Sequence, residues 1–266
     1  MRCIMNNFSE CDVLVVGGGP AGSTIASLLA QQQRHVVVLE KELFPRFHIG
    51  ESLLPLNLPL FERLGVADEV RRIGVYKPGA ELISDAHEAA GIFRFSDNPY
   101  LSVGYSYQVR RAEFDKLLLD NSRRLGAEVR EEVRVTNVVL NKGQRPRITA
   151  VDEKGKTDWL PRFLVDATGR DTLLSGQLGL KRIDKQNNTA AVFGHFRNVP
   201  RRPGDKAGMI TVYLFDHGWF WMIPLPDEVM SVGVVGTRAF FKAKGGNIDA
   251  LFAEAVAATP SLAAHM

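Results

Sequence analysis

Two short apolar runs near the start of the chain predict the first elements of the fold. Residues 13–16 (VLVV) and 36–39 (VVVL) are apolar at every position and rich in β-branched side chains. Such runs are typical of strands that are buried on both faces of a parallel sheet. Between them, Gly17, Gly19 and Gly22 precede an Ala- and Leu-bearing segment, which predicts a tight turn leading into a helix. The whole segment is therefore expected to fold as a strand, a turn, a helix and a second strand.

The spacing of these glycines, together with an acidic residue after the second strand, indicates a dinucleotide site. Gly17 permits the turn, Gly19 lets the backbone approach a pyrophosphate, and Gly22 lets helix and strand pack closely, with the phosphates at the helix N-terminus. Glu40 lies 21 residues after Gly19, where its carboxylate can accept hydrogen bonds from both ribose hydroxyls. A carboxylate there disfavours a 2′-phosphate. The residues by themselves predict FAD or NAD rather than NADP.

The pattern further along predicts that another sheet interrupts this nucleotide unit. Residues 77–80 (KPGA) break the chain before alternating segments that suggest a hairpin, and a strand-like segment and a helix come next. Short strands with polar turns then predict a small antiparallel meander. The apolar run 163–166 (FLVD) is expected to rejoin the parallel sheet and to place Asp166 and Gly169 at its carboxyl edge, where ligands collect.

The last third of the chain alternates strand-like segments with turn residues. Its apolar segments predict a second sheet and then an Ala-rich helix, at 189–196, 209–215, 218–224, 229–236 and 248–258 respectively. We therefore expect an α/β fold that combines a parallel nucleotide-binding sheet with a second sheet.

Composition and charge narrow the possible functions. With 266 residues, of which 45% are hydrophobic and 24% charged, the chain is long enough for one large or two modest domains. Its formal net charge of +3 arises from dispersed Lys and Arg, so we expect no nucleic-acid partner. No run approaches the roughly 20 apolar residues of a membrane span, and we expect neither a membrane partner nor a signal peptide. Cys3 and Cys11 lack the spacing of metal ligands, which favours free thiols in a reducing compartment, a cytoplasmic location and no metal site.

Three separated motifs together resemble the FAD-dependent monooxygenase and reductase superfamily. They are the dinucleotide unit ending in Glu40, the helix opening 111–115 (RAEFD) and the mid-chain residues 165–169 (VDATG). Within that superfamily, 44–55 (FPRFHIGESLLP), 77–80 (KPGA) and above all 218–224 (GWFWMIP) resemble the flavin-dependent halogenases. The last segment matches that family's GWxWxIP signature at every fixed position.

The resemblance implies an FAD-binding, Rossmann-like parallel sheet of the glutathione-reductase type, interrupted by a smaller antiparallel substrate-binding sheet. We place the discontinuous FAD-binding domain at residues 8–76 and 104–182, and the substrate-binding sheet domain at 77–103 and 183–266. Members of the halogenase family continue well beyond this length and carry a second flavin motif, a Gly-Asp-Ala and then a Pro-rich stretch. The chain therefore resembles the N-terminal part of a halogenase, truncated at its C-terminus. We expect it to bind FAD weakly and to turn over poorly by itself.

The resemblance also implies which residues hold the cofactor and which face the substrate. The implied FAD-binding positions are Gly17, Gly19, Pro20, Ala21, Gly22, Glu40, Lys41, Arg46, Gly50, Glu51, Ser52, Arg111, Asp166 and Gly169. Trp219, Trp221 and Pro224 are implied to form a wall beside the flavin that leaves little room for a nicotinamide. Because this wall leaves little room for a nicotinamide, it favours FAD over NAD as the cofactor.

The implied reaction is the FADH2- and O2-dependent chlorination or bromination of an electron-rich aromatic. A partner flavin reductase supplies FADH2, and a halide ion attacks the flavin hydroperoxide to give hypohalous acid. Lys77, in its Lys-x-Gly-Ala context, matches the lysine that steers this acid in the family, and the pKa of a lysine falls readily when the side chain is desolvated. The amino-acid sequence of 44–55 resembles that of phenol and pyrrole halogenases, several of which act on substrates tethered to a carrier protein. It therefore favours a small phenol or pyrrole over tryptophan as the substrate.

Two other functions fit the same residues. One is a flavin hydroxylase or reductase of the same superfamily, in which NAD(P)H reduces the flavin directly, although the aromatic residues Trp219 and Trp221 argue against it. The other is a non-catalytic nucleotide-binding fragment. Rapid flavin reduction by NADPH would indicate the first, and a chain that carries and accepts no FAD would indicate the second.

Overall fold

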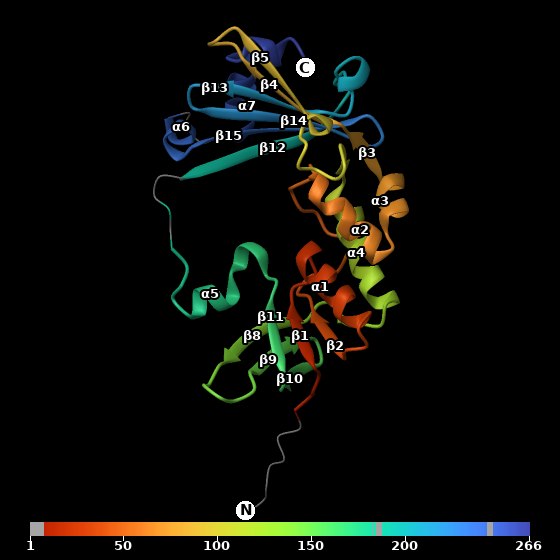
Figure 1. Ribbon diagram of the computed structural model, residues 1–266. Helices are drawn as coiled ribbons and strands as arrows, with labels where there is room; N and C mark the ends of the chain where they lie inside the picture. The colour runs from red at the N-terminus through yellow and green to blue at the C-terminus, as the bar shows by residue number, and fades with distance from the viewer. Residues whose placement is uncertain (1–7, 183, 185–187, 244–246) are drawn as a thin grey trace, which may run out of the picture. The chain divides into compact units, whose positions relative to one another are not determined.

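The chain folds into two compact units, each made from two separate stretches of sequence (Figure 1). The computed structural model describes residues 8–182, 184, 188–243 and 247–266. The first unit runs to His48 and resumes at Arg111–Arg182, and the second contains Ile49–Arg110 and the chain after Arg182. One unit therefore interrupts the other along the sequence, as the predicted fold class requires.

The first unit is built on a four-stranded parallel sheet. The strands lie side by side in the order β11-β1-β2-β7, with bounds β1 (Val13–Val16), β2 (Val36–Leu39), β7 (Glu128–Arg130) and β11 (Phe163–Asp166). Its helices are α1 (Pro20–Ala30), α4 (Arg111–Arg124) and the short α5 (Leu173–Gln177). Val13 on β1 pairs in parallel with Val36 on β2 and with Phe163 on β11, so the predicted return of the chain to this sheet is confirmed.

Successive side chains of β1 are buried in two different layers. Val13 and Val15 pack with Ala26 of α1 and Leu119 of α4. Leu14 and the next alternate residue pack instead against a three-stranded antiparallel sheet, which is the predicted meander. Its strands are β8 (Arg134–Val139), β9 (Arg147–Asp152) and β10 (Gly155–Trp159). Because both faces of β1 are covered, every position of the strand must be apolar.

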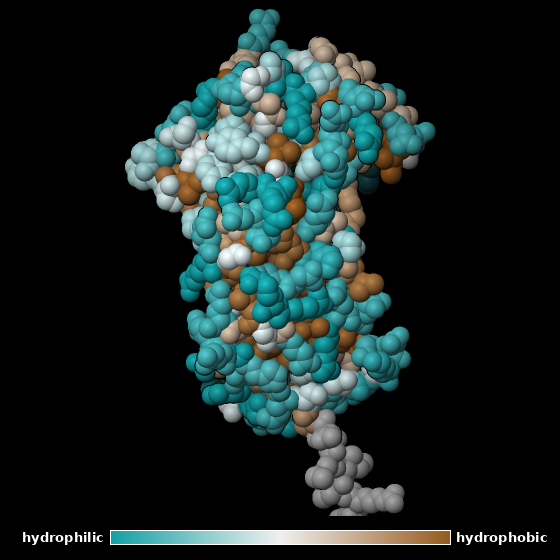
Figure 2. Space-filling model, turned by 90° about the vertical axis from the view of Figure 1, so that its right-hand side faces the viewer, coloured by the Kyte–Doolittle hydropathy of each residue, from teal (hydrophilic) through white to brown (hydrophobic). Residues whose placement is uncertain are grey.

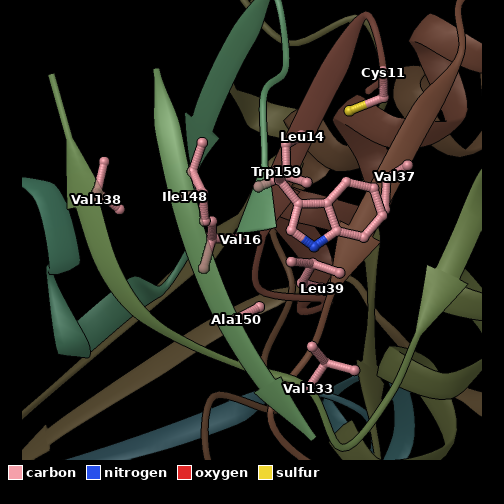
Figure 3. Packing of buried hydrophobic residues seen from close by; sticks show 10 residues of the cluster. All are labelled: Cys11, Leu14, Val16, Val37, Leu39, Val133, Val138, Ile148, Ala150 and Trp159. Atoms are coloured by element: carbon pink, nitrogen blue, oxygen red, sulfur yellow. The ribbon is translucent and has the colours of Figure 1, made fainter. Parts of the chain in front are cut away.

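An indole ring fills the space between the parallel sheet and the meander. Figure 3 shows the Trp159 ring among Leu14, Val37 and Leu39. Cys11 belongs to the same buried cluster, and burial raises the pKa of its thiol to about 12. Cys11 is therefore an inert core residue, while Cys3 lies outside the described residues.

The second unit is built on a six-stranded sheet in the order β12-β15-β14-β13-β4-β5. Its strands are β4 (Gly79–Ser84), β5 (Ala89–Arg94), β12 (Thr189–Arg197), β13 (Ile210–Phe215), β14 (Gly218–Leu225) and β15 (Val229–Thr237). Neighbouring strands run antiparallel except β4 and β13, which run parallel. This sheet is larger than the parallel one, although the sequence predicts a smaller one, because β4 and β5 join the four strands of the C-terminal segment.

Helices cover one face of the six-stranded sheet. They are α6 (Arg238–Ala243), α7 (Ile248–Ala257) and α8 (Pro260–Ala263). Phe220 and Met222 of β14 pack on this side with Ala255 and Leu262. The alternate residue Trp221 faces the other side, where Ile49 contributes to its cluster. Residues of β14 therefore divide between a helix-covered face and a face that carries the tryptophans.

Residues 49–76 and 104–110 pack with the second unit, whereas the predicted domains placed them with the FAD-binding sheet. Strands β3 (Gly74–Lys77) and β6 (Ser106–Val109) form an antiparallel pair, and Ser52 forms a β-bridge with Gln108. Helices α2 (Leu58–Leu64) and α3 (Ala67–Ile73) lie between these paired segments. Short 3₁₀ helices are present at Pro55–Asn57, Phe95–Asp97, Gly169–Asp171 and Gly204–Lys206. The bridge between Ser52 and Gln108 joins residues that are more than 50 positions apart along the chain. The apolar pattern of each segment does not indicate this long-range pairing.

Hydrophilic residues cover most of the face shown in Figure 2, with apolar residues between them. Within the described part of the chain, no helix combines the length and the hydrophobicity that crossing a membrane requires.

Candidate functional site

The glycine turn after β1 is shaped by two close backbone approaches. Gly17 has φ +101°, and a Cβ there would lie 2.5 Å from the carbonyl oxygen of Ala167. A Cβ on Gly22 would lie 1.9 Å from the carbonyl oxygen of Gly17. Gly19 differs, because the nearest atom to its Cβ position is Arg46 Nη2 at 3.6 Å. The first and third glycines therefore serve packing, while Gly19, at the N-cap of α1, leaves room for a ligand.

Glu40 ties this turn to the end of β2. The residue is only 4% exposed, and Oε2 accepts a hydrogen bond of 2.6 Å from the backbone N–H of Gly18. Oε1 accepts a second one, of 2.9 Å, from the backbone N–H of Glu42. Each carboxylate oxygen can accept more than one hydrogen bond, so the group can hold the turn and still receive ribose hydroxyls.

A cavity of about 460 Å³ opens at the carboxyl ends of β1, β2 and β11, entirely within the first unit. The predicted cofactor residues that line it are Gly17, Gly19, Pro20, Ala21, Glu40, Lys41, Arg46, Arg111 and Gly169. Gly22 and Asp166 do not line it. This placement at the carboxyl edge of a parallel sheet is the usual one for ligands in open α/β folds.

Two arginines in the cavity wall are held by one buried carboxylate. Asp115 is 0% exposed, and Arg111 donates to it through Nε at 2.7 Å and through Nη2 at 2.9 Å. Arg46 Nη1 donates to the same carboxylate at 3.2 Å, and the Arg46 guanidinium lies 4.4 Å from the centre of the Phe44 ring. Arg46 Nε also pairs with Glu42 Oε2 at 2.8 Å, so two guanidinium groups and two carboxylates balance in charge, and the arginines offer N–H donors beside the N-terminus of α1. The motif at 111–115 contains Asp115, but sequence reasoning assigned it no role, although its i, i+4 spacing from Arg111 could have indicated one.

Asp166 shapes the loop that carries Gly169. Its carboxylate accepts hydrogen bonds from the backbone and hydroxyl of Thr168 and from the backbone N–H of Leu174. Burial of the Asp166 carboxylate raises its pKa, but these hydrogen bonds outweigh burial and hold the pKa below its usual value. At the rim, Lys41 donates a hydrogen bond to Asp171, which lowers the pKa of that carboxyl group.

These residues fit an adenine dinucleotide. The unhindered Gly19 and the N-terminus of α1 suit a pyrophosphate, the Arg46–Arg111 pair adds N–H donors, and Glu40 suits a ribose.

Lys77, at the end of β3 in the second unit, is a buried amine. The residue is 3% exposed, and Nζ donates a hydrogen bond of 2.7 Å to the carbonyl oxygen of Leu53. Nζ also lies 5.1 Å from the centre of the Phe95 ring. Burial lowers the pKa of Lys77 from its ordinary value near 10.5 to about 8. The amine is therefore neutral in a far larger fraction of molecules than an exposed lysine would be.

Gly50, Glu51 and Ser52 also belong to the second unit, outside the cavity that holds the glycine turn. Glu51 is 1% exposed, and its Oε1 lies 2.7 Å from Nε2 of His195 on β12. Sequence reasoning did not find His195, because the two residues are 144 positions apart and no local pattern links them.

The two tryptophans of the GWFWMIP segment lie side by side on β14. Their ring centres are 6.0 Å apart, and Trp221 Nε1 donates a hydrogen bond of 3.1 Å to Ser231 Oγ. The Trp221 ring lies over Gly233, where a Cβ would come within 2.2 Å of it. Pro224 lies on the opposite face of the strand with Met222, so the structure does not bring Pro224 together with the tryptophans.

Comparison with known proteins agrees with the geometry of the first unit. The model of a family described as FAD binding domain matches residues 10–262. The chain belongs to this family. FAD is therefore the cofactor, and the cavity beside Gly19 and Glu40 is the candidate site for it.

Several relatives are named as halogenases. A tryptophan 2-halogenase of Chondromyces crocatus is 35% identical over 260 residues, which are 95% of this chain and 48% of that protein. A 1H-pyrrole-2-carbonyl-[peptidyl-carrier protein] chlorinase of Pseudomonas fluorescens is 31% identical over 270 residues, 93% of this chain and 60% of that protein. The structure of the myxobacterial chondrochloren halogenase CndH superimposes with a TM-score of 0.90 at 35% identity, covering 97% of this chain and 60% of that one. The resemblance to flavin-dependent halogenases, enzymes of the FAD-dependent oxidoreductase type, is confirmed. The chain spans about half the length of the curated relatives it matches.

Proposed function

We propose that this chain serves in the FADH2- and O2-dependent chlorination or bromination of an electron-rich aromatic ring. The support comes from the GWFWMIP segment, from the named halogenases among its relatives, and from a buried lysine at the expected position. When bound, reduced FAD supplies hypohalous acid from dioxygen and a halide ion. The reduced cofactor would come from a flavin reductase, because the aromatic residues of β14 are proposed to leave little room for a nicotinamide.

The first unit binds the cofactor in this proposal. Arg46 and Arg111 donate hydrogen bonds to the pyrophosphate, and Asp115 positions both of them. Glu40 receives the ribose hydroxyls. None of these groups takes part in halogen transfer, so their loss is expected to weaken FAD binding.

Lys77 aims the hypohalous acid, and its burial is the single observation that carries the proposal. No carboxylate pairs with Lys77 among the described residues, so its charge is not stabilised by an ion pair. With a pKa of about 8, roughly one molecule in ten carries a neutral amine at pH 7. A neutral amine can attack the halogen, and an ammonium can donate a hydrogen bond to the oxygen of the acid.

The substrate is proposed to be a phenol or a pyrrole. The amino-acid sequence of segment 44–55 is similar to that of halogenases that act on those substrates, and one relative is named for a pyrrole group on a carrier protein. Another relative is named for tryptophan, so tryptophan is the competing substrate for the assay.

The proposal is tested by supplying the chain with FAD, a flavin reductase, NADH, and chloride or bromide. A phenol, a carrier-tethered pyrrole and tryptophan are offered in parallel, and products are detected by the isotope pattern of the halogen. Because the chain is expected to turn over poorly by itself, we expect a low but measurable yield of halogenated phenol or pyrrole with wild-type protein and none with Lys77→Ala, while flavin oxidation by oxygen continues. Product formation that is unchanged in Lys77→Ala would exclude this role for Lys77.

Mixing the FAD-loaded chain with NADPH and no reductase separates the alternative. Rapid bleaching of the flavin absorbance in the stopped-flow instrument would indicate a hydroxylase or reductase in place of a halogenase.

A further inference from the structure

Several polar side chains share one face of the small β3–β6 sheet with Lys77. Lys77 pairs in register with Ser106, and Val75 pairs with Gln108. Ser52 pairs with Gln108 from the other edge of β6. Residues that are paired across strands point to the same face, as do residues two apart along one strand. Lys77, Ser106, Gln108 and Ser52 therefore project from the same face, and Tyr76 and Tyr107 project from the other.

Three oxygen atoms on this face are buried without a hydrogen-bond partner. They are Ser106 Oγ, Gln108 Oε1 and Ser52 Oγ. Ser106 and Gln108 are each 0% exposed. Buried polar groups are nearly always paired with protein or with ordered water, because leaving them unpaired is unfavourable. Three such atoms on one face therefore indicate a missing small polar partner.

The loop after Lys206 closes against this part of the sheet. Gln108 Nε2 donates a hydrogen bond of 3.2 Å to the carbonyl oxygen of Gly208. A Cβ on Gly208 would lie 1.7 Å from the carbonyl oxygen of Tyr76, so the loop backbone packs directly on β3. The unpaired oxygens are therefore enclosed, and a partner for them must be small.

Most charged groups on the surrounding elements have partners. Glu51 Oε1 lies 2.7 Å from His195 Nε2, while Glu51 Oε2 is buried without a hydrogen-bond partner. Glu81 pairs with both Arg202 and Lys206, and Arg94 pairs with Asp205. Asp97, beside Phe95, accepts a hydrogen bond from Ser96. Tyr107 lies on the opposite face of the sheet, and the Leu53 carbonyl takes one of the three donors of Lys77 Nζ. The ammonium thus has donors to spare, and no described carboxylate forms an ion pair with it.

We propose that Ser106, Gln108 and Ser52 hold a buried cluster of water molecules that hydrogen-bonds to Lys77 Nζ and exchanges its proton. Ser106 is the main positioning residue, because it lies directly opposite Lys77. Water in such a cluster needs two to four polar partners, which this face provides. The proposal rests on the proposed function only for its purpose: a lysine that meets hypohalous acid must shed a proton before its nitrogen can attack.

Titration of Lys77 in the full chain tests the water cluster without any turnover. Lysine is labelled with ¹³C at Cε, the Lys77 signal is assigned by its absence in Lys77→Met, and its shift is measured against pH. Loss of an acceptor disfavours the ammonium, so Ser106→Ala should lower the pKa of Lys77 by about one pH unit, a tenfold change in the ratio of neutral to charged amine. Ser52→Ala should lower it by less, and Ser106→Thr, which keeps the hydroxyl, should restore it.

Ser27→Ala is the matched control. Ser27 Oγ is also buried and unpaired, but Ser27 lies on α1 in the first unit, so its removal should leave the Lys77 titration unchanged. If the pKa of Lys77 were unchanged in Ser106→Ala and the free energy of unfolding of that variant increased, the Ser106 hydroxyl would have no bound water. That result would overturn the proposal. Halogenation that survives Lys77→Ala would defeat the proposed function instead, and the titration result would stand.

Discussion

The two units enclose their central sheets differently. In the first, helices cover one face of the parallel sheet and the antiparallel β8–β10 sheet covers the other. In the second, α7 and α8 cover one face, while the opposite face keeps partly exposed aromatic residues, with Trp219 38% exposed. The doubly covered sheet presents its strand ends and a backbone turn as a ligand site. The sheet covered by helices on one face leaves side chains such as Trp219 partly exposed, while Lys77, on the neighbouring β3, is buried.

This contrast predicts the largest effect where backbone clearance is smallest. Gly22→Ala would place a Cβ 1.9 Å from the Gly17 carbonyl oxygen, so the turn must open. We expect a loss of about 3 kcal/mol in the free energy of unfolding and no FAD binding. Urea denaturation and quenching of FAD fluorescence measure the two quantities.

Gly126→Ala is the control for this substitution. Gly126 has φ +106° but no atom within 4 Å of its Cβ position, so only backbone strain of about 1–2 kcal/mol is expected. If both variants lost FAD binding equally, the role given to the clearance at Gly22 would be wrong.

Removal of the buried carboxylate of the first unit is expected to have the next largest effect. Asp115→Ala leaves the charges of Arg46 and Arg111 without their shared partner. Breaking such a buried pair typically costs about 3 kcal/mol, and the arginines would no longer be held in place for the pyrophosphate. Calorimetric titration with FAD should show weaker binding, with Asp115→Asn intermediate. Wild-type affinity in Asp115→Ala would contradict the positioning role.

Lys77 supplies a test of the second unit that depends on pH. The fall of its pKa from 10.5 to about 8 is about 2.5 pH units, so a charged Lys77 destabilises the folded state by about 3 kcal/mol. Between those values the unfolded chain binds more protons, so this penalty is full below about pH 8 and is relieved as pH rises toward 10.5. Lys77→Met should therefore be more stable than wild type at pH 7, with the advantage shrinking by about pH 10. Urea midpoints at both pH values measure this, and a constant difference would show that Lys77 is not desolvated.

The smallest effect is expected at the rim of the FAD cavity. Lys41 pairs with Asp171, whose side chain is more than half exposed, so the pair contributes less than about 1 kcal/mol. Lys41→Met should change stability and FAD affinity slightly, and added salt should reduce the difference between variant and wild type. A loss as large as that of Asp115→Ala would show that the rim, and not the buried arginine pair, governs binding.

Local signals predicted the first unit well. The runs at β1 and β2, the glycine spacing and Glu40 lie within about 30 residues, and each element there forms as expected. The predicted domain borders differed from the compact units because β3 and β6 pair over a long separation. Pro224 was grouped with the tryptophans, but a strand sends alternate residues to opposite faces.

By itself, the sequence determined that the chain has a dinucleotide-binding turn between two buried strands, because the glycines and Glu40 lie close together along the chain. The choice of FAD and of Lys77 came from the resemblance of its motifs to flavin-dependent halogenases. Only the tertiary structure decided which groups surround these residues. Asp115 holds two arginines, Glu51 meets His195 across 144 positions, and Ser106 faces Lys77 through strand register. Such partners depend on long-range pairing and burial, which no local pattern of polar and apolar residues specifies.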